Sequence, residues 1–438
     1  MEYKSVTLGA INQTYRFVFH KDFNSDFLLF LKNLLYVVSG TMPSIILLAA
    51  FNILAARFLG PMEYGKYTLI QSIAAFIGIP MIMGYNTTLA KFLPENKDPE
   101  MTAKTISSVY LLTFYFTLAT VAVCLFLMPQ LSKILNISTE FLMLAMIFAV
   151  VYTFYLITTN TLRGLMQMKL YSIFQVAYSA MVLAIFLILV LAGPLTYQSM
   201  LLPVFVSYGV TGTIIFLVIR KHLVFTIDIS LLLQLTKYSL FCVVGATSYT
   251  VYSNISQVLI HIYMTPRDLG IYGAYSLAAI SVTSLMLSTF ITVFFPTASQ
   301  YHDKGPIFSM FFKLIPFLVI LGIPLLVVSE IAVLWLYGSQ YTMYPYLILL
   351  FAIAGVCQSI QNLYGWILNT DSNRGVKISS AGAIIIAVVN LLLNATLIPV
   401  FGIGGAVMAL TLSYITAFLI MILLTKRFYR TGDAIAGN

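Results

Sequence analysis

Charged residues are scarce in this chain, and their scarcity excludes a soluble fold. Only 8% of the 438 residues are Asp, Glu, Lys or Arg, whereas 60% are hydrophobic, and the mean hydropathy is +0.97. A soluble globular domain carries about 25% charged residues. So few charges could not cover a water-soluble surface. The sequence therefore predicts an integral membrane protein, in which the chain length reflects the number of bilayer crossings and not the number of soluble domains.

Residues that build metal sites and catalytic centres are equally rare. The three cysteines, Cys124, Cys242 and Cys357, lie inside apolar runs, where cysteine behaves as a small hydrophobic residue. The four histidines show no metal-ligand spacing. Of the 14 acids, all but Glu330 fall in predicted loops, tails or interfacial segments, and no Walker sequence is present. These absences argue against an enzyme, a resident cofactor and a metal site.

Long apolar runs are abundant. About 20 apolar residues cross the hydrocarbon core as a helix, and twelve such runs begin near residues 34, 67, 105, 141, 171, 196, 240, 272, 311, 345, 378 and 403. The first run follows roughly thirty mixed residues, so we expect it to be retained as a crossing rather than cleaved as a signal. The runs predict an all-α membrane protein with twelve transmembrane helices.

The distribution of lysine and arginine predicts the orientation. With the N-terminus inside, the cytoplasmic loops and tails hold 19 of the 23 basic residues, and the outer loops hold only Arg57, Lys66, Lys133 and Arg267. Cytoplasmic loops carry such an excess, so both termini are predicted to be cytoplasmic. The net charge of +9 is spread over loops facing anionic lipid headgroups, so we expect no nucleic-acid partner.

The chain repeats itself at an offset of 205 residues. PMEYGKY, residues 61–67, returns as PRDLGIY, residues 266–272, and Ser25 and Lys32 share the offset with Ser230 and Lys237. We interpret each heptapeptide as an outer turn in which Pro ends a helix, Gly permits the turn and Tyr anchors the next helix at the headgroups. The repeat predicts two parallel six-helix bundles, and such halves commonly rock around a shared central site.

This repeat divides the chain into five parts. Residues 1–33 are predicted to form a cytoplasmic and interfacial segment, and residues 34–219 the first six-helix bundle. Residues 220–238 are predicted to be a cytoplasmic linker with an interfacial helix. Residues 239–425 would form the second bundle and residues 426–438 a cytoplasmic tail.

Neutral polar residues recur on single faces of several predicted crossings. These stripes are Tyr249, Ser253, Asn254, Gln257 and His261; Ser281, Ser284, Ser288 and Thr292; Gln358, Gln361, Asn362 and Asn369; and, in the first two helices, Asn52, Gln71, Asn86, Thr87 and Thr88. Such residues either hold helices together or line a wet cavity. Stripes in both halves favour a shared cavity.

A cavity of amides, hydroxyls and tyrosine rings suits a sugar. Moving one unpartnered hydroxyl into hydrocarbon costs roughly 4–8 kcal/mol, so an oligosaccharide cannot cross lipid unaided. Positive charge near the ends of the crossings comes from Arg57 and Lys91, with Arg163 and His261 as weaker candidates for binding. The candidate binding residues are therefore Arg57, Lys91, Asn52, Asn86, Tyr249, Asn254, Gln257 and His261.

Each charged candidate also has a structural interpretation. Arg57 and Lys91 could be interfacial anchors whose long stems lie along apolar surface, and His261 a hydrogen-bonded interface histidine. Glu330 lies within a crossing, which favours H⁺ or Na⁺ coupling, but Trp335 five residues later favours an interfacial position.

Three segments of the chain have a familiar pattern: AARFLGPMEYGKY (55–67), TLRGLMQMK (161–169) and NLLLNATLIPVFGIGGAVMA (390–409). They resemble polysaccharide flippases of the Wzx type, within the multidrug/oligosaccharidyl-lipid/polysaccharide (MOP) superfamily. The resemblance implies a non-enzymatic flippase that moves a polyprenyl-pyrophosphate-linked oligosaccharide to the outer leaflet by alternating access, for O-antigen, capsule or exopolysaccharide synthesis. The pyrophosphate of such a substrate would need positive charge, for which Arg57 and Lys91 are the main candidates. We expect a monomer in a bacterial or archaeal cytoplasmic membrane, in contact with membrane lipids and working with glycosyltransferases and a polysaccharide polymerase.

Other readings of the same features stay open. A MATE-like exporter of organic cations would share the helices but should carry more intramembrane acids. A lipid II flippase would have two further helices. A non-transporting scaffold for polysaccharide assembly is disfavoured by the polar stripes and by proline within helices, at Pro43, Pro80 and Pro324.

Overall fold

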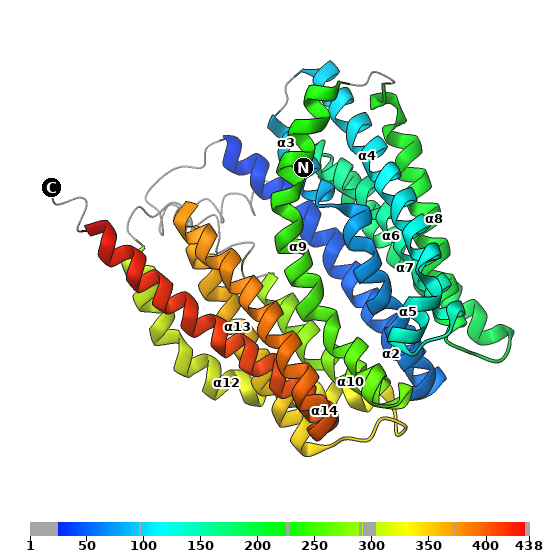
Figure 1. Ribbon diagram of the computed structural model, residues 1–438, viewed down its shortest axis with the longest axis vertical. Coiled ribbons are helices and arrows are strands. Elements are labelled where there is room, and N and C mark those ends of the chain that lie inside the picture. Colours follow the sequence, from blue (N-terminus) through cyan, green and yellow to red (C-terminus); the bar gives the residue numbers. More distant parts are fainter. Residues whose placement is uncertain are drawn as a thin grey trace, which may run out of the picture.

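The computed structural model describes residues 25–95, 98–224, 228–288, 291, 304–370 and 373–433. All regular structure within these residues is helical, and ten of their helices are long and apolar enough to cross a membrane. The predicted all-α membrane architecture is confirmed at this level. Helices of the first half gather on one side of the molecule and those of the second half on the other, with α9 between them (Figure 1).

The elements follow the chain in two series. The first half contains α2 (Ser25–Ile82), α3 (Tyr85–Glu95), α4 (Pro99–Phe126), α5 (Met128–Leu135), α6 (Thr139–Gly164), α7 (Met168–Ala192), α8 (Gln198–Ile219) and the 3₁₀ turn η1 (Arg220–His222). The second half contains α9 (Ile229–Tyr263), α10 (Pro266–Ser276), the π-helix η2 (Leu277–Ser281), α12 (Gly305–Tyr337), α13 (Pro345–Asn369) and α14 (Asn373–Asp433). Helical residues 282–288 continue η2.

α2 consists of two arms that meet at Gly60. The φ of Gly60 is 77°, a left-handed conformation that glycine adopts without a Cβ penalty. Ser172 of α7 donates a hydrogen bond to Tyr36 O in the first arm, and Gly164 of α6 packs against Leu89 of α3, which follows the second arm. Both ends of α2 therefore meet the α6–α7 turn, so the chain reverses at Gly60.

α14 reverses in the same way at Gly402, where φ is 57°. Gly382 and Met421, about equally far from Gly402 on the two arms, are in contact. Gly402 itself packs against Met264 at the end of α9. The second half therefore ends in a helical hairpin, as the first half begins with one.

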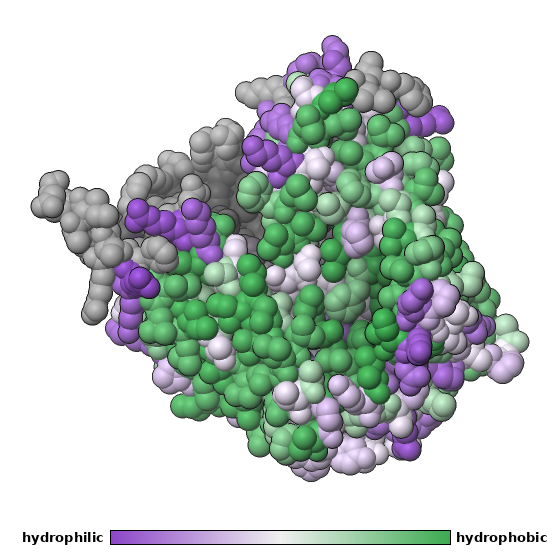
Figure 2. Space-filling view, in the orientation of Figure 1, coloured by the Kyte–Doolittle hydropathy of each residue, from purple (hydrophilic) through white to green (hydrophobic). Residues whose placement is uncertain are grey.

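We call the two ends of the molecule the Gly60 end and the Gly84 end. The Gly60 end holds Gly60, Gly402 and the α12–α13 loop, whose Gln340 lies beside Gly60. The Gly84 end holds the α6–α7 turn and the start of α9, where Ser239 lies beside Gly84. Most of the face between them is apolar in Figure 2, and Phe126 and Leu191 are more than 80% exposed on the surface.

The two copies of the repeated heptapeptide pack against each other. A Cβ on Gly65 would lie 1.8 Å from Pro266 O, and a Cβ on Gly270 would lie 1.9 Å from Pro61 O. Only glycine at both positions allows the second arm of α2 and α10 to approach this closely. The repeat therefore marks a reciprocal helix crossing, which we call the Gly65–Gly270 crossing.

This packing corrects our interpretation of the heptapeptide. The chain reverses at Gly60, before the motif begins, so Gly65 is a crossing residue rather than a turn residue. Tyr67 and Tyr272 are only 2% and 3% exposed, so they pack in the protein interior instead of anchoring helices at the headgroups. The residue spacing suits both a turn and a helix crossing, and the close packing of the two copies shows that they form a helix crossing.

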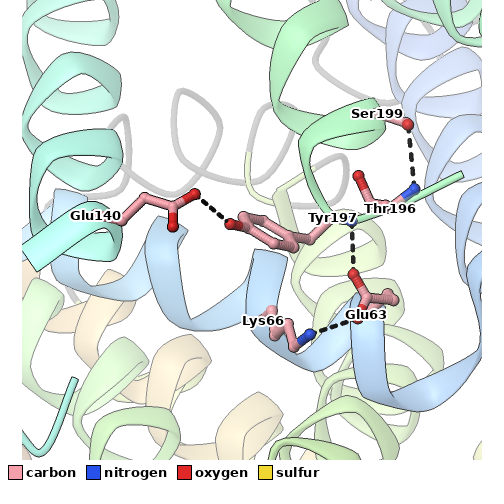
Figure 3. Close-up of polar contacts among 6 residues, drawn as sticks. All are labelled: Glu63, Lys66, Glu140, Thr196, Tyr197 and Ser199. Atoms are coloured by element: carbon pink, nitrogen blue, oxygen red, sulfur yellow. Dashed lines mark hydrogen bonds and ion pairs between the residues drawn. The ribbon is translucent and has the colours of Figure 1, made fainter. Parts of the chain in front are cut away.

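The acid of each copy satisfies backbone amides at a helix start. Glu63 pairs with Lys66 and accepts a hydrogen bond of 2.9 Å from Tyr197 N, directly before α8 (Figure 3). The Tyr197 hydroxyl in turn donates to Glu140 of α6 at 2.7 Å (Figure 3). In the second copy, Asp268 forms a capping box with Thr265 at the start of α10.

The predicted interfacial helices are not separate elements. α9 runs without interruption from Ile229 to Tyr263, and no Pro or Gly occurs before Gly245 to break it. The first arm of α2 is likewise continuous from Ser25 to Gly60, and α14 continues past the predicted boundary at residue 425. Residues 1–24, 225–227 and 434–438 of the predicted segments lie outside the described residues.

Candidate functional site

A cavity of about 900 Å³ lies within the second half of the molecule. Its walls come from α9, from the helical segment that runs from α10 through η2 to Ser288, and from α13 and α14. The polar and aromatic lining residues are Tyr249, Tyr252, Ser253, Gln257, Tyr272, Ser276, Ser281, Ser284, Ser288, Gln358, Asn362, Trp366 and Tyr414. The lining extends toward the Gly84 end, where α13 ends.

Helical periodicity brings three of the predicted stripes to this cavity. Tyr249, Ser253 and Gln257 recur every four residues, so they share one face of α9. Ser281, Ser284 and Ser288 line the cavity from the neighbouring helix, and Gln358 and Asn362 line it from α13. Thr292 of the second stripe lies outside the described residues.

The cavity wall is ordered by a few polar contacts. Gln358 Nε2 donates a hydrogen bond of 3.0 Å to Ser284 Oγ, while Gln358 Oε1 is buried without a hydrogen-bond partner among the described residues. Ser72 in the second arm of α2 donates to Gln257 Oε1, which connects the first half to the wall. The Tyr252 and Tyr414 rings meet edge to face at 6.3 Å. The wall thus offers hydroxyls, amides and aromatic faces, and an acceptor that a ligand could satisfy.

The wall carries no charge within the described part of the chain. Every lining side chain there is a neutral hydroxyl, amide, aromatic or aliphatic group. No group of three or more potential metal ligands occurs among the described residues either. The arrangement suits a neutral, hydroxyl-rich ligand, because hydroxyl and amide groups both donate and accept hydrogen bonds.

Two of the predicted binding residues, Tyr249 and Gln257, line the cavity, and the three predicted asparagines do not. Asn254 Nδ2 donates to Thr250 O and Asn52 Nδ2 to Leu48 O, each within its own helix. Asn86 is half-buried on α3, away from the lining.

The four cationic candidates lie at opposite ends of the molecule. Arg57 is exposed beside the α12–α13 loop, and a ring nitrogen of His261 lies 3.3 Å from Asn136 O, both at the Gly60 end. Lys91 Nζ lies 4.3 Å from the centre of the Tyr238 ring, and Arg163 stacks over Tyr171, both at the Gly84 end. One bound pyrophosphate could not contact all four.

The lining that is described belongs to the second half, whereas we expected both halves to contribute. The centre of the first half is filled by Tyr155, Tyr178 and Tyr208, whose ring centroids lie 4.7–5.0 Å apart. Those rings pack against one another. A separate space of about 680 Å³ in the first half is lined mainly by apolar side chains of α4, α6 and α8. The first half instead reaches the cavity through Ser72.

Sequence reasoning missed the aromatic part of the wall. Tyr252, Trp366 and Tyr414 lie outside the predicted stripes, which consist mainly of amides and hydroxyls, and Tyr272 was predicted to lie at the headgroups. A signal existed for Tyr252, which lies three residues after Tyr249 and therefore on nearly the same face of α9.

Glu330 lies in the protein interior rather than in an exposed interfacial belt. Its side chain is 0% exposed, and neither carboxyl oxygen has a hydrogen-bond partner among the described residues. Trp335, five residues later, is 72% exposed, so the two residues occupy different surroundings. Glu330 does not belong to the cavity lining.

Comparison with solved structures shows the fold. An inward-facing MATE family transporter of the MOP superfamily matches with a TM-score of 0.56 and 13% identity, covering 89% of this chain and 99% of the transporter. The lipid II flippase MurJ in an inward closed conformation matches with a TM-score of 0.56 and 16% identity, covering 90% of this chain and 87% of MurJ. The chain therefore has the MOP transporter fold.

Comparison with sequences identifies the family. The "Probable low-salt glycan biosynthesis flippase Agl15" of Haloferax volcanii is 30% identical over 41% of this chain and 39% of its own length. An "Uncharacterized membrane protein" of Methanocaldococcus jannaschii is 24% identical over 89% of this chain and 96% of its own length. A family model described as "Polysaccharide biosynthesis protein" matches residues 53–345. The chain is thus a multi-pass membrane protein that belongs to the polysaccharide biosynthesis protein family, and the resemblance to Wzx-type flippases of the MOP superfamily is confirmed.

Proposed function

We propose that this protein is a flippase that translocates a polyprenyl-pyrophosphate-linked oligosaccharide from the cytoplasmic to the outer leaflet by alternating access, for surface polysaccharide synthesis. The observation that carries the proposal is the neutral polar cavity inside a chain of this family. Its hydroxyls, amides and tyrosine rings can replace the water around a sugar, each of whose hydroxyls would otherwise cost roughly 4–8 kcal/mol in hydrocarbon.

The topology that we propose has twelve crossings with both termini in the cytoplasm. Each arm of α2 and α14 is one crossing, and the Gly84 end faces the cytoplasm. The basic residues support this orientation, since Lys91, Lys104 and Arg163 lie toward the Gly84 end, whereas Arg57 and Lys66 lie toward the Gly60 end. Positive residues are enriched on cytoplasmic sides. The cavity would then open inward.

The separation of the cationic candidates suggests sequential roles. In this proposal the glycan enters the cavity from the Gly84 end while the pyrophosphate meets Lys91, and Arg57 meets it at the Gly60 end after the conformational change. The polyprenyl tail stays in the bilayer beside the protein. Glycosyltransferases would supply the substrate and a polymerase would consume it, with the flippase acting as a monomer.

The neutral wall makes the main alternative weaker. An exporter of organic cations would gain from a carboxylate in its binding cavity, and the described lining has none. Among the described lining residues there is neither a nucleophile with its base nor a metal cluster, and the proposal involves no catalysis.

Reconstitution into vesicles tests the proposal. Purified protein should expose a lipid-linked oligosaccharide, supplied in one leaflet, to a lectin on the other side. Gln358→Ala with Tyr414→Ala should slow this exposure, whereas Gly245→Ala, at a position with open space around it, should not. Equal exposure in protein-free vesicles, or an undiminished rate in the cavity variant, would contradict the proposal.

A further inference from the structure

Glu330 is a buried acid that the cavity does not use. Leu326 and Leu334, one turn before and one turn after it on α12, are 5% and 0% exposed, and Glu330 itself is 0% exposed. Both carboxyl oxygens lack a hydrogen-bond partner among the described residues. An ionised carboxylate in such surroundings is far less stable than a neutral one. These surroundings therefore favour the protonated form of the carboxyl group in this conformation.

No cation faces Glu330 among the described residues of the packed helices. On α10 the titratable neighbour is Tyr275, whose hydroxyl is already hydrogen-bonded to the backbone of the α12–α13 loop. Tyr64 of α2 packs against Tyr337, which lies about two turns after Glu330 on α12. α13 and η2 contribute no charged group that acts on the carboxyl.

The surroundings favour a proton over a sodium ion. Alkali and alkaline-earth cations bind where several oxygen ligands converge. Thr283 Oγ1 is another buried oxygen without a hydrogen-bond partner in the part of the chain that the structure describes. It lies beside Leu326 and Gly355, about one turn from Glu330. One hydroxyl and one carboxyl group do not form a coordination shell, but they can exchange a hydrogen bond once the carboxyl ionises.

A π-helix connects this acid to the cavity. η2 packs against α12 on one side, and its residues Ile280 and Ser281 line the cavity on the other. A π-turn holds one residue more than an α-turn. If η2 relaxes to an α-helix, the residues after it rotate by about 100°. That rotation would move Thr283 relative to Glu330 and Ser284 within the cavity.

We propose that Glu330 is a proton-binding site whose ionisation is transmitted to the cavity through η2. The proton dissociates from the carboxyl group to water in the alternative conformation, where Thr283 can donate a hydrogen bond to the carboxylate, and it returns when η2 regains its π-turn. The identity of the transported ligand rests on the proposed function, whereas the proton site does not.

Infrared spectroscopy tests the proton site without any substrate. Protein in vesicles at neutral pH should show the carbonyl band of a buried protonated carboxyl group, and Glu330→Gln should lose it. Ser329→Ala, one residue away, should retain the band. Absence of the band in the parent protein, or its persistence in Glu330→Gln, would overturn the assignment.

Thiol labelling tests transmission through η2, in a chain whose three native cysteines are replaced. The labelling rate of Ser284→Cys should change with pH in the parent and not in the Glu330→Gln background. Ser253→Cys faces the same cavity from α9 and should not respond. A pH response at both positions, or at neither, would overturn transmission through η2.

Transport measurements separate the proton from other ions. With one proton per cycle, each pH unit of gradient should change the leaflet distribution of substrate about tenfold, and Glu330→Gln should abolish this response. Exchanging Na⁺ for K⁺ should change nothing. A Na⁺-dependent response, or a full pH response in Glu330→Gln, would overturn the proposal. If no preparation translocates glycan, the proposed function fails while the infrared band still decides the proton site.

Discussion

Replacing Gly65 by alanine should loosen the Gly65–Gly270 crossing. The added Cβ would lie 1.8 Å from Pro266 O, whereas a carbon–oxygen contact needs about 3.3 Å. The second arm of α2 and α10 would therefore have to separate by roughly 1.5 Å. Overpacking of this kind costs about 1–3 kcal/mol. If the protein also has a conformation in which the crossing is open, the ratio of closed to open molecules should fall by about 5- to 150-fold.

Thermal unfolding in detergent and labelling of a cysteine at Thr68 measure this effect. Thr68 is 8% exposed and lies beside Gly273, so its labelling should accelerate when the crossing opens. Gly270→Ala should behave like Gly65→Ala, and the double variant should lose less than the sum, because both act on one contact. Gly245→Ala, which meets no atom within 4 Å, is the control. Wild-type melting and labelling in both crossing variants would refute the reasoning.

Three further predictions concern single contacts. Glu63→Gln should weaken the links to Lys66 and to Tyr197 N, lowering the free energy of unfolding by about 1–3 kcal/mol; denaturant unfolding checks this. Gln358→Ala should weaken glycan binding by about 1–3 kcal/mol in calorimetry, with the melting temperature as control. Hydrogen bonds from Ser230 hold the pKa of Asp228 below its ordinary value of 3.8. The Asp228 cap therefore stabilises α9 fully at pH values above 3.8, and this stabilisation is lost as the pH falls through the lowered pKa. Melting curves at falling pH should show the loss, and Asp228→Asn should remove that pH dependence.

Composition and periodicity predicted much of the architecture. Scarce charge indicated a membrane protein, and four-residue spacing placed Tyr249, Ser253 and Gln257 on one face of a helix. These features depend on local geometry that every helix shares. They could therefore be inferred without knowing which helices are neighbours.

Features that depend on packing between distant segments could not be predicted in this way. A Pro-to-Gly spacing of four residues suits a turn and a crossing equally, and only the contact of Gly65 with Pro266 distinguishes them. The polar cavity lies in the second half, whereas Tyr155, Tyr178 and Tyr208 pack against one another in the first half, and the sequence does not show which half holds which arrangement. Likewise, the continuity of α9 through residue 238 follows from packing along its length, which an amphipathic pattern does not report.

The reciprocity of the Gly65–Gly270 crossing has a consequence for the origin of the chain. Each copy of the heptapeptide offers a glycine to the proline carbonyl of the other, so the contact has the form of an isologous interface between two identical subunits. A single ancestral unit of six helices could have formed the same contact with a second copy of itself. Gene duplication would then have fused a homodimer whose interface was already complete.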